Sequence, residues 1–201
     1  MPHAILSPVI EQVSRLSRTV ASGRVDVSSS EYKAARLDPT LSRDARERRI
    51  NALDTALFAL DSLESSVLTP DLLMSINRVL SIDFVSSGFR DFAVPKFRYL
   101  DPDLIAQDCT AFCMRVRRPR SKLGFYPACD LMFDVHWSVN LRGHYFSDAC
   151  GRTATVLGAW LSWKWHGEVL PLPARERYLS VASASDPKLS WRVAMRLKPR
   201  Q

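Results

Sequence analysis

The chain is poor in glycine and has no long uncharged apolar run. Only 7 of its 201 residues are glycine, which argues against a many-turned β-sandwich or β-barrel. Its most apolar stretch, residues 156–165, contains Lys164 and is far shorter than the roughly 20 apolar residues needed to span a bilayer. The N-terminus lacks a basic segment followed by a long apolar one. We therefore expect no membrane partner, no Sec signal peptide and a cytoplasmic protein, with export by another route left open.

Cysteine and histidine are also few, and their spacing matches no zinc site. The chain has four cysteines, an even number, but it is long and core-rich enough not to need disulfide bonds for stability. Cys109 and Cys113 lie four residues apart on one helical face, which favours buried, reduced thiols. His136 and His166 are expected at the surface or half-buried rather than as ligands.

The composition that remains is that of a folded protein with excess positive charge. Hydrophobic residues make up 46% and charged residues 24%, which is typical of globular domains. The length suits a single domain over residues 1–201. With 28 Lys and Arg against 21 Asp and Glu, the net charge is +7. This excess is compatible with a nucleic acid, an acidic surface or a phosphate-bearing small molecule as partner.

The apolar spacing is helical along most of the chain, which predicts a mainly α fold. Thr69-Pro70 and Asp101-Pro102 each place a capping side chain before a proline at the first helical position. Residues 82–100 interrupt the pattern with alternating apolar residues, and there we expect one short β-hairpin. The predicted helices cover residues 5–22, 42–64, 70–81, 102–117, 127–142, 152–165, 173–184 and 187–197, with a short C-terminal tail to 201.

Residues 143–152 carry the strongest indication of chemistry. A loop that runs into a helix N-terminus presents unpaired N–H groups and the positive end of the helix dipole, which suits phosphate. Arg152 in the first turn opposes that dipole, and a bound polyphosphate would compensate it. Asp148 is suited to a divalent cation that bridges phosphate oxygens, and His144 to a general base. This set indicates phosphoryl or nucleotidyl transfer.

The segment His144–Arg152, with the sequence HYFSDACGR, resembles the signature of the Fic domain family, H-x-F-x-[DE]-[AG]-N-[GK]-R. Every defined slot matches except the Asn. Outlying segments resemble the family's flap approach and flanking helices, so the resemblance spans roughly residues 28–185. These outlying segments are Ser87-Gly88-Phe89-Arg90, residues 49–53, residues 68–73 and Glu176-Arg177-Tyr178-Leu179. The resemblance implies a helical bundle with one β-hairpin, the flap.

The resemblance also implies a role for each matching residue. His144 would deprotonate the acceptor hydroxyl, Asp148 would bind Mg²⁺ on the nucleotide phosphates, and Phe146 would anchor the loop in the core. Family members mostly transfer AMP from ATP to a Ser, Thr or Tyr hydroxyl, and some transfer other phosphate-containing groups. Phosphate binding would fall to Ala149, Cys150, Gly151 and Arg152. A flap over about residues 91–99 would pair with an extended peptide by strand addition, and its substrate-side residues would be Phe89, Arg90 and Val94.

Two departures from the family pattern bear on the donor. Cys150 stands in the Asn slot, and a thiol is a weak donor and acceptor. Thr155 stands where adenylylating members tend to carry a second Arg. We therefore expect an altered donor or acceptor, the latter being a protein side chain or a small molecule in a biosynthetic pathway. Residues 27–40 correspond in position to the family's inhibitory segment, with Glu31 as the candidate inhibitory residue, although the segment does not match the family's inhibitory pattern.

Two other functional classes stay open at this point. A degenerate Fic fold would bind a ligand or partner without catalysis, as the loss of the Asn and the second Arg suggests. A basic nucleic-acid-binding domain ranks last, because no segment resembles a dedicated recognition helix. The sequence makes no prediction of the oligomeric state.

Overall fold

Helices dominate the part of the chain that the computed structural model describes, and this confirms the mainly α fold class. That part comprises residues 42–45, 47, 48, 51, 56, 67–81, 88–94, 98–117, 125–166, 170, 172, 173 and 175–196. Its α-helices are α4 (Pro70–Leu80), α5 (Ile105–Arg115), α6 (Phe125–His136), α7 (Cys150–His166), α8 (Arg175–Ser180) and α9 (Pro187–Arg196). Two 3₁₀ turns, Pro102–Leu104 and Val181–Ser183, and a π-helical segment, Trp137–Leu141, extend them.

The predicted helix starts are confirmed by their capping bonds. Thr69 Oγ1 accepts from the N–H of Leu72 at 3.2 Å, and Asp101 Oδ1 accepts from the N–H of Asp103 at 3.1 Å. Within the predicted helix 42–64, the described residues 43–45, 47, 48, 51 and 56 are helical. The predicted helix 5–22 and the segment 27–40 with Glu31 lie outside the described residues.

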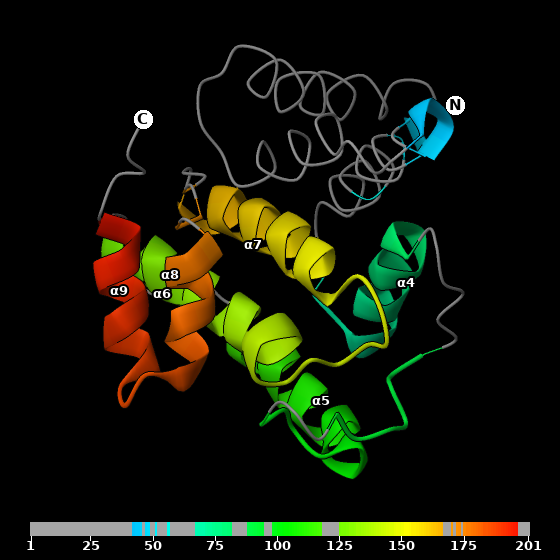
Figure 1. Ribbon diagram of the computed structural model, residues 1–201, viewed down its shortest axis with the longest axis horizontal. Coiled ribbons are helices and arrows are strands. Elements are labelled where there is room, and N and C mark those ends of the chain that lie inside the picture. Colours follow the sequence, from blue (N-terminus) through cyan, green and yellow to red (C-terminus); the bar gives the residue numbers. More distant parts are fainter. Residues whose placement is uncertain are drawn as a thin grey trace.

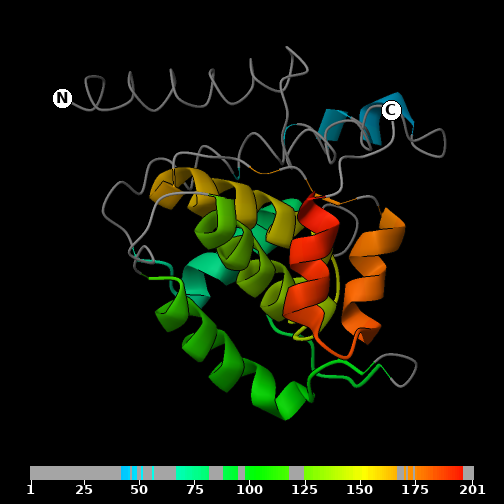
Figure 2. The same cartoon turned by 90° about the vertical axis from the view of Figure 1, so that its left-hand side faces the viewer.

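Helices α6 and α7 form the centre of the described fold (Figure 1). Helices α4 and α5 lie on one side of this pair, and α8 and α9 on the other (Figures 1 and 2). None of the described helices is both long enough and apolar enough to cross a membrane. The central pair matters for function because the loop between α6 and α7 is the segment 142–149, which carries most of the predicted site.

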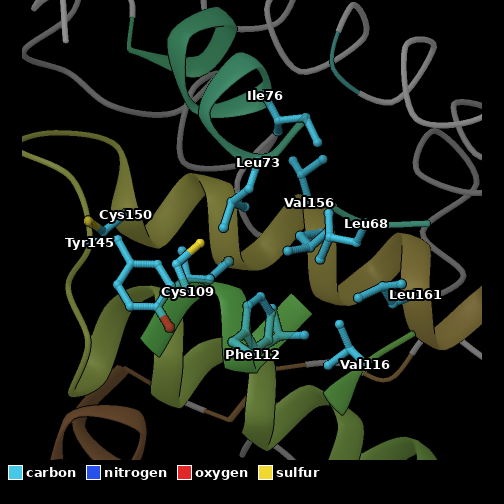
Figure 3. Packing of buried hydrophobic residues seen from close by; sticks show 14 of the residues in the cluster. Leu68, Leu73, Ile76, Cys109, Phe112, Val116, Tyr145, Cys150, Val156 and Leu161 are labelled. Atoms are coloured by element: carbon cyan, nitrogen blue, oxygen red, sulfur yellow. The ribbon is translucent and has the colours of Figure 1, made fainter. Parts of the chain in front are cut away.

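The core has two parts, one on each side of the central pair. The first joins α4, α5 and α7 with the loop after α6, and the side chains of Leu73 and Ile76 meet α7 there (Figure 3). Tyr145 and Cys150 close its end near the loop (Figure 3). The second part surrounds Trp191 between α6, α8 and α9. The four cysteines are free and buried, as expected for Cys109 and Cys113, whereas His136 and His166 are buried, contrary to the expectation.

An ion-pair cluster joins α9 to α6. The buried Asp130 carboxylate accepts from Arg192 Nε at 2.7 Å and lies 3.0 Å from Lys188 Nζ. Burial alone would raise the pKa of Asp130, but the hydrogen bonds from Arg192 and Lys188 outweigh it and lower the pKa. The folded state therefore favours the charged form of this carboxyl group.

We expect Asp130→Asn to destabilise the protein by about 1–3 kcal/mol at pH 7, because charged hydrogen bonds to the two cations are lost. The folded pKa of Asp130 lies below its unfolded value, so its stabilisation is present above that value and is lost as the pH falls through the folded pKa. Urea unfolding from pH 7 to pH 2 checks this. The gap between wild type and variant should close below about pH 4, and a gap that stayed constant would contradict the assignment.

The predicted β-hairpin within residues 82–100 is not confirmed, and the described residues 88–94 and 98–100 contain no strand. A side chain takes over the pairing that a strand ladder would supply. The guanidinium of Arg90 donates to the carbonyls of Phe92 and Leu100 on the two arms of this segment. The guanidinium therefore connects the described parts of the two arms through these carbonyls.

Candidate functional site

The loop that carries the site begins where α6 gives way to a π-helical turn, Trp137–Leu141. The N–H groups of Arg142 and Gly143 both donate to the carbonyl of Trp137, at 2.9 and 3.0 Å. A Cβ on Gly143 would lie 1.7 Å from the carbonyl oxygen of Ser138, so only glycine fits this close approach. Single π turns are frequent at functional sites, and His144 lies three residues after the end of this one.

The imidazole of His144 is oriented from two directions. Its Nδ1 lies 3.1 Å from the main-chain carbonyl of Asn140, and its ring stacks on Tyr99 with 4.1 Å between centroids and an angle of 1°. The backbone of His144 is left-handed, with φ 46°, a conformation that non-glycine residues adopt rarely. Since Nδ1–H donates to a carbonyl in the neutral ring, the lone pair resides on Nε2.

Burial lowers the pKa of His144, the hydrogen bond to Asn140 opposes that shift, and the nearby charge of Arg90 adds to it. The imidazole is therefore held in its neutral form at neutral pH. A neutral imidazole with its lone pair on Nε2 has the state that a general base requires.

Arg90 holds the loop by hydrogen bonds to three of its carbonyls. Its side chain is 2% exposed, and its Nε donates to the carbonyl of His144 at 2.6 Å. Its Nη2 also lies 3.4 Å from the carbonyl of Gly143, and its backbone N–H donates to the carbonyl of Tyr145 at 2.9 Å. The structure thus places Arg90, predicted on the substrate side of a flap, under the loop that holds His144.

The aromatic residues of the loop are anchored in the core. Phe146 is fully buried, and its ring lies 5.7 Å from that of Phe89, centroid to centroid. The hydroxyl of the buried Tyr145 donates to Asp108 Oδ2 of α5 at 2.6 Å. Phe89 therefore lies on the core side of the loop, whereas Val94 is half-buried further along the chain. Phe146 occupies the position that a loop anchor requires.

The thiol of Cys150 closes the loop into a tight turn. Its Sγ donates to the carbonyl of Phe146 at 3.2 Å and lies 3.3 Å from the N–H of the same residue. Burial raises the pKa of this thiol to about 12, so it stays protonated and is no nucleophile at neutral pH. Ala149 sits in a left-handed conformation, with φ 58°. The described contacts of the Cys150 thiol therefore stabilise the conformation of the loop.

An asparagine of α4 holds the end of the loop where α7 begins. The Nδ2 of the buried Asn77 lies 3.0 Å from both the carbonyl of Asp148 and Thr153 Oγ1, and Ser81 donates to its Oδ1 at 3.4 Å. Sequence reasoning missed Asn77 because it interpreted residues 70–81 only through their apolar residues. An uncharged polar residue between Ile76 and Leu80 in an apolar stripe is the signal that was available.

The charged pair of the site lies at the start of α7. Arg152 Nη2 is 3.0 Å from Asp148 Oδ2, and the side chains are 16% and 33% exposed. The other terminal nitrogen of Arg152, Nη1, is buried and has no hydrogen-bond partner among the described residues. Gly151 is half-buried beside Arg152 in the first turn. An unpartnered N–H on a guanidinium at a helix N-terminus is suited to an anionic oxygen.

The structure brings His144, Phe146, Asp148 and residues 149–152 together in one loop and helix start, and Arg90 supports them from the neighbouring segment. Tyr99, Asn77 and Asn140 join the site without having been predicted. The predicted inhibitory residue Glu31 lies outside the described residues. The chain matches no protein-family model, and no curated protein matches it significantly.

Proposed function

We propose that the chain is a Fic-like transferase that moves a nucleotidyl or other phosphate-containing group from a nucleotide-type donor to a hydroxyl acceptor. One observation carries this proposal. A neutral, oriented imidazole and an arginine with a buried, unpartnered N–H stand at the two ends of one loop, which runs into the N-terminus of α7. The acceptor is a protein side chain or a small molecule.

Each of these groups has a defined role in the proposed transfer. His144 Nε2 takes the proton of the acceptor hydroxyl while that oxygen forms a bond to a donor phosphorus. The bond from the same phosphorus to the leaving phosphate oxygen breaks, and its electron pair leaves with that oxygen. Arg152 and the N–H groups at the start of α7 stabilise the negative charge of the phosphates. His144 and Arg152 therefore act on opposite partners of the reaction.

Asp148 fits a magnesium ion that is shared with the donor. Mg²⁺ in nucleotide sites takes one or two carboxylates together with substrate phosphates, and it neutralises charge on those phosphates when bound. The carboxylate of Asp148 is a third exposed. In the described part of the chain no three His, Cys, Asp or Glu side chains form a group that would hold a metal ion by itself. In this proposal the ion would enter with the donor phosphates, and Asp148 would supply a carboxylate ligand.

The turn closed by Cys150 supports an altered donor relative to the ATP-using members of the family. Its sulfur both accepts a hydrogen bond from the N–H of Phe146 and donates one to the carbonyl of Phe146. A thiol also offers no amide to a phosphate. Fewer side-chain contacts are then left for a triphosphate. A donor with a shorter phosphate chain is compatible with the contacts that Arg152 and the start of α7 supply.

The ion pair between Asp148 and Arg152 favours a second candidate function, a binding protein without catalysis. The opposite charges of these two side chains are paired at 3.0 Å. Two of the charged groups that would bind a ligand are therefore already bound to each other. Such a protein would bind a phosphate-bearing ligand by opening this pair. The two candidates differ in whether product forms after binding.

We expect Arg152→Ala to weaken nucleotide binding by about 10- to 100-fold, because a charge-assisted hydrogen bond to phosphate contributes about 1.5–3 kcal/mol. Calorimetry with nucleoside mono-, di- and triphosphates and Mg²⁺ measures the affinity. Arg196→Ala is the matched control, since it removes an equal charge from an exposed position on α9. Unchanged affinity in Arg152→Ala would contradict the assignment of Arg152.

Transfer itself is tested by mass spectrometry. The wild-type protein is incubated with the nucleotides that bind and with Ser-, Thr- and Tyr-containing peptides or small alcohols, and a mass addition of a phosphate-containing group is sought. Product formation supports the transferase. Binding without product in any combination supports the second candidate, and absence of binding to every phosphate-bearing probe overturns both.

A further inference from the structure

A chain of polar contacts leads from the imidazole of His144 to α8. The Nδ1 of His144 lies 3.1 Å from the carbonyl of Asn140. The side-chain Nδ2 of the same Asn140 donates to the hydroxyl of Tyr178 at 2.7 Å. That hydroxyl lies 3.0 Å from Nδ1 of His136. Asn140 thus links His144 to Tyr178 through its own backbone and side chain.

The hydrogen positions in this chain follow from the donors that are present. Because the amide of Asn140 donates to the oxygen of Tyr178, the hydroxyl hydrogen of Tyr178 is available for Nδ1 of His136. His136 is fully buried, and desolvation by burial lowers its pKa to about 3. His136 is therefore neutral at physiological pH, and its Nδ1 shares a hydrogen bond with the hydroxyl of Tyr178.

The far end of the chain is fixed by tight packing. His136 stacks on Trp191 with 5.4 Å between ring centroids and an angle of 30°, and it meets the ring of Tyr178 edge-on at 5.4 Å. Trp191 Nε1 in turn donates to the carbonyl of Cys129 at 2.9 Å. A Cβ on Gly158 of α7 would come within 3.5 Å of His136 Nε2. His136, which contacts the hydroxyl of Tyr178, is consequently packed against residues of α7, α8 and α9.

The near end of the chain lies where the backbone is least regular. Asn140 belongs to the π-helical segment Trp137–Leu141, and its carbonyl accepts from the side chain of His144. A peptide group at an irregular helix end can rotate at lower cost than one inside an α-helix. A tether on the side chain of Asn140 therefore also limits the direction of its carbonyl.

We propose that Tyr178 is a positioning residue that fixes Asn140 and, through the carbonyl of Asn140, the orientation and tautomer of His144. Its effect on turnover rests on the proposed function, whereas its effect on the imidazole does not. The C-terminal helices thereby contribute to the site although they lie outside the loop. Tyr178 contacts no substrate and acts only through Asn140.

The test removes the hydroxyl of Tyr178 and keeps its ring. In the full-length Tyr178→Phe variant, nitrogen-detected NMR of the His144 imidazole follows which ring nitrogen carries the proton. We expect the wild type to hold the proton on Nδ1 and the variant to show a mixture of both tautomers. If transfer occurs, its kcat should fall about 10- to 100-fold, as for a small misplacement of a reacting group, with the KM for the donor little changed.

Two further variants separate positioning from loss of stability. Trp191→Phe disturbs the same packing but leaves the hydroxyl of Tyr178 in place, so it should lower the melting temperature and leave the His144 signals unchanged. Asn140→Ala removes the tether from its other side and should reproduce the effect of Tyr178→Phe. The double variant, Tyr178→Phe with Asn140→Ala, should be no worse than either single variant, since both break one chain.

The outcomes are separable from those of the proposed function. A wild-type protein with no transfer activity but with the expected tautomer change in Tyr178→Phe overturns the transferase and leaves the positioning role standing. Unchanged His144 signals in both Tyr178→Phe and Asn140→Ala overturn the positioning role, whatever the activity. The positioning role is also overturned if Trp191→Phe changes the tautomer of His144 as much as Tyr178→Phe does.

Discussion

Replacement of His144 by alanine should lower the rate of group transfer by about 10²- to 10⁴-fold, the usual contribution of a positioned general base. The affinity for the nucleotide should change little, because the proposed phosphate contacts come from Arg152 and the start of α7. A steady-state assay that separates kcat from the donor dissociation constant measures both. Equal loss of rate and affinity would instead indicate that removal of the imidazole collapses the loop.

The left-handed backbone of His144 supplies a sharper form of this experiment. Alanine at φ 46° keeps the strain of that conformation, whereas glycine adopts it freely. His144→Gly should therefore be the more stable of the two variants, and both should be inactive. The cavity above Tyr99 in His144→Gly should admit free imidazole and recover part of the activity. Full activity in either variant without imidazole would remove His144 as the base.

The pH profile of the wild type provides an independent check on the same residue. The pKa of His144 is lowered, with burial as the main cause. A base is active when it is unprotonated. The midpoint of the acidic limb of the kcat/KM profile should therefore lie at a pH below the ordinary histidine pKa of about 6.5. Tyr178→Phe should move this limb, because it alters the hydrogen bond at Nδ1.

The backbone of the site could be predicted from the sequence because its determinants are local. Proline after a capping residue fixed the starts of two helices, and glycine followed by arginine marked a loop that enters a helix. These signals act over a few residues and depend little on the rest of the fold. The grouping of His144, Asp148 and Arg152 follows from the same local reasoning, whereas the burial of Phe146 was expected only from the family resemblance.

The supports of the site could not be predicted because they act over long distances in the chain. Asn77 reaches the loop across 71 residues, and Tyr178 reaches Asn140 across 38. The place of Asn77 in an apolar stripe indicates burial but not its partner, and a single Tyr in a helix gives no signal of either. The hairpin prediction was not confirmed for a related reason, since alternating residues indicate a strand only where backbone partners exist, and here Arg90 supplies the bonds.

Loss of the Arg90 side chain should destabilise the fold strongly. Its buried guanidinium donates to the carbonyls of His144, Phe92 and Leu100, and lies within reach of that of Gly143. A carbonyl that loses its donor away from water costs about 1–3 kcal/mol, and less where water replaces the donor, as it can at the exposed Phe92. Arg90→Ala should therefore lose about 4 kcal/mol or more, a large part of the 5–15 kcal/mol typical of a domain.

Two comparisons decide whether geometry or charge explains that loss. Arg90→Lys keeps the charge, but one ammonium group cannot reach carbonyls on both arms of the segment and on the loop, so it should be destabilised nearly as much. Arg98→Ala removes an exposed charge nearby and should change stability by less than about 0.5 kcal/mol. Urea unfolding followed by circular dichroism measures all three. A stable Arg90→Lys would show that the positive charge, and not the set of bonds to the carbonyls, provides the stabilisation.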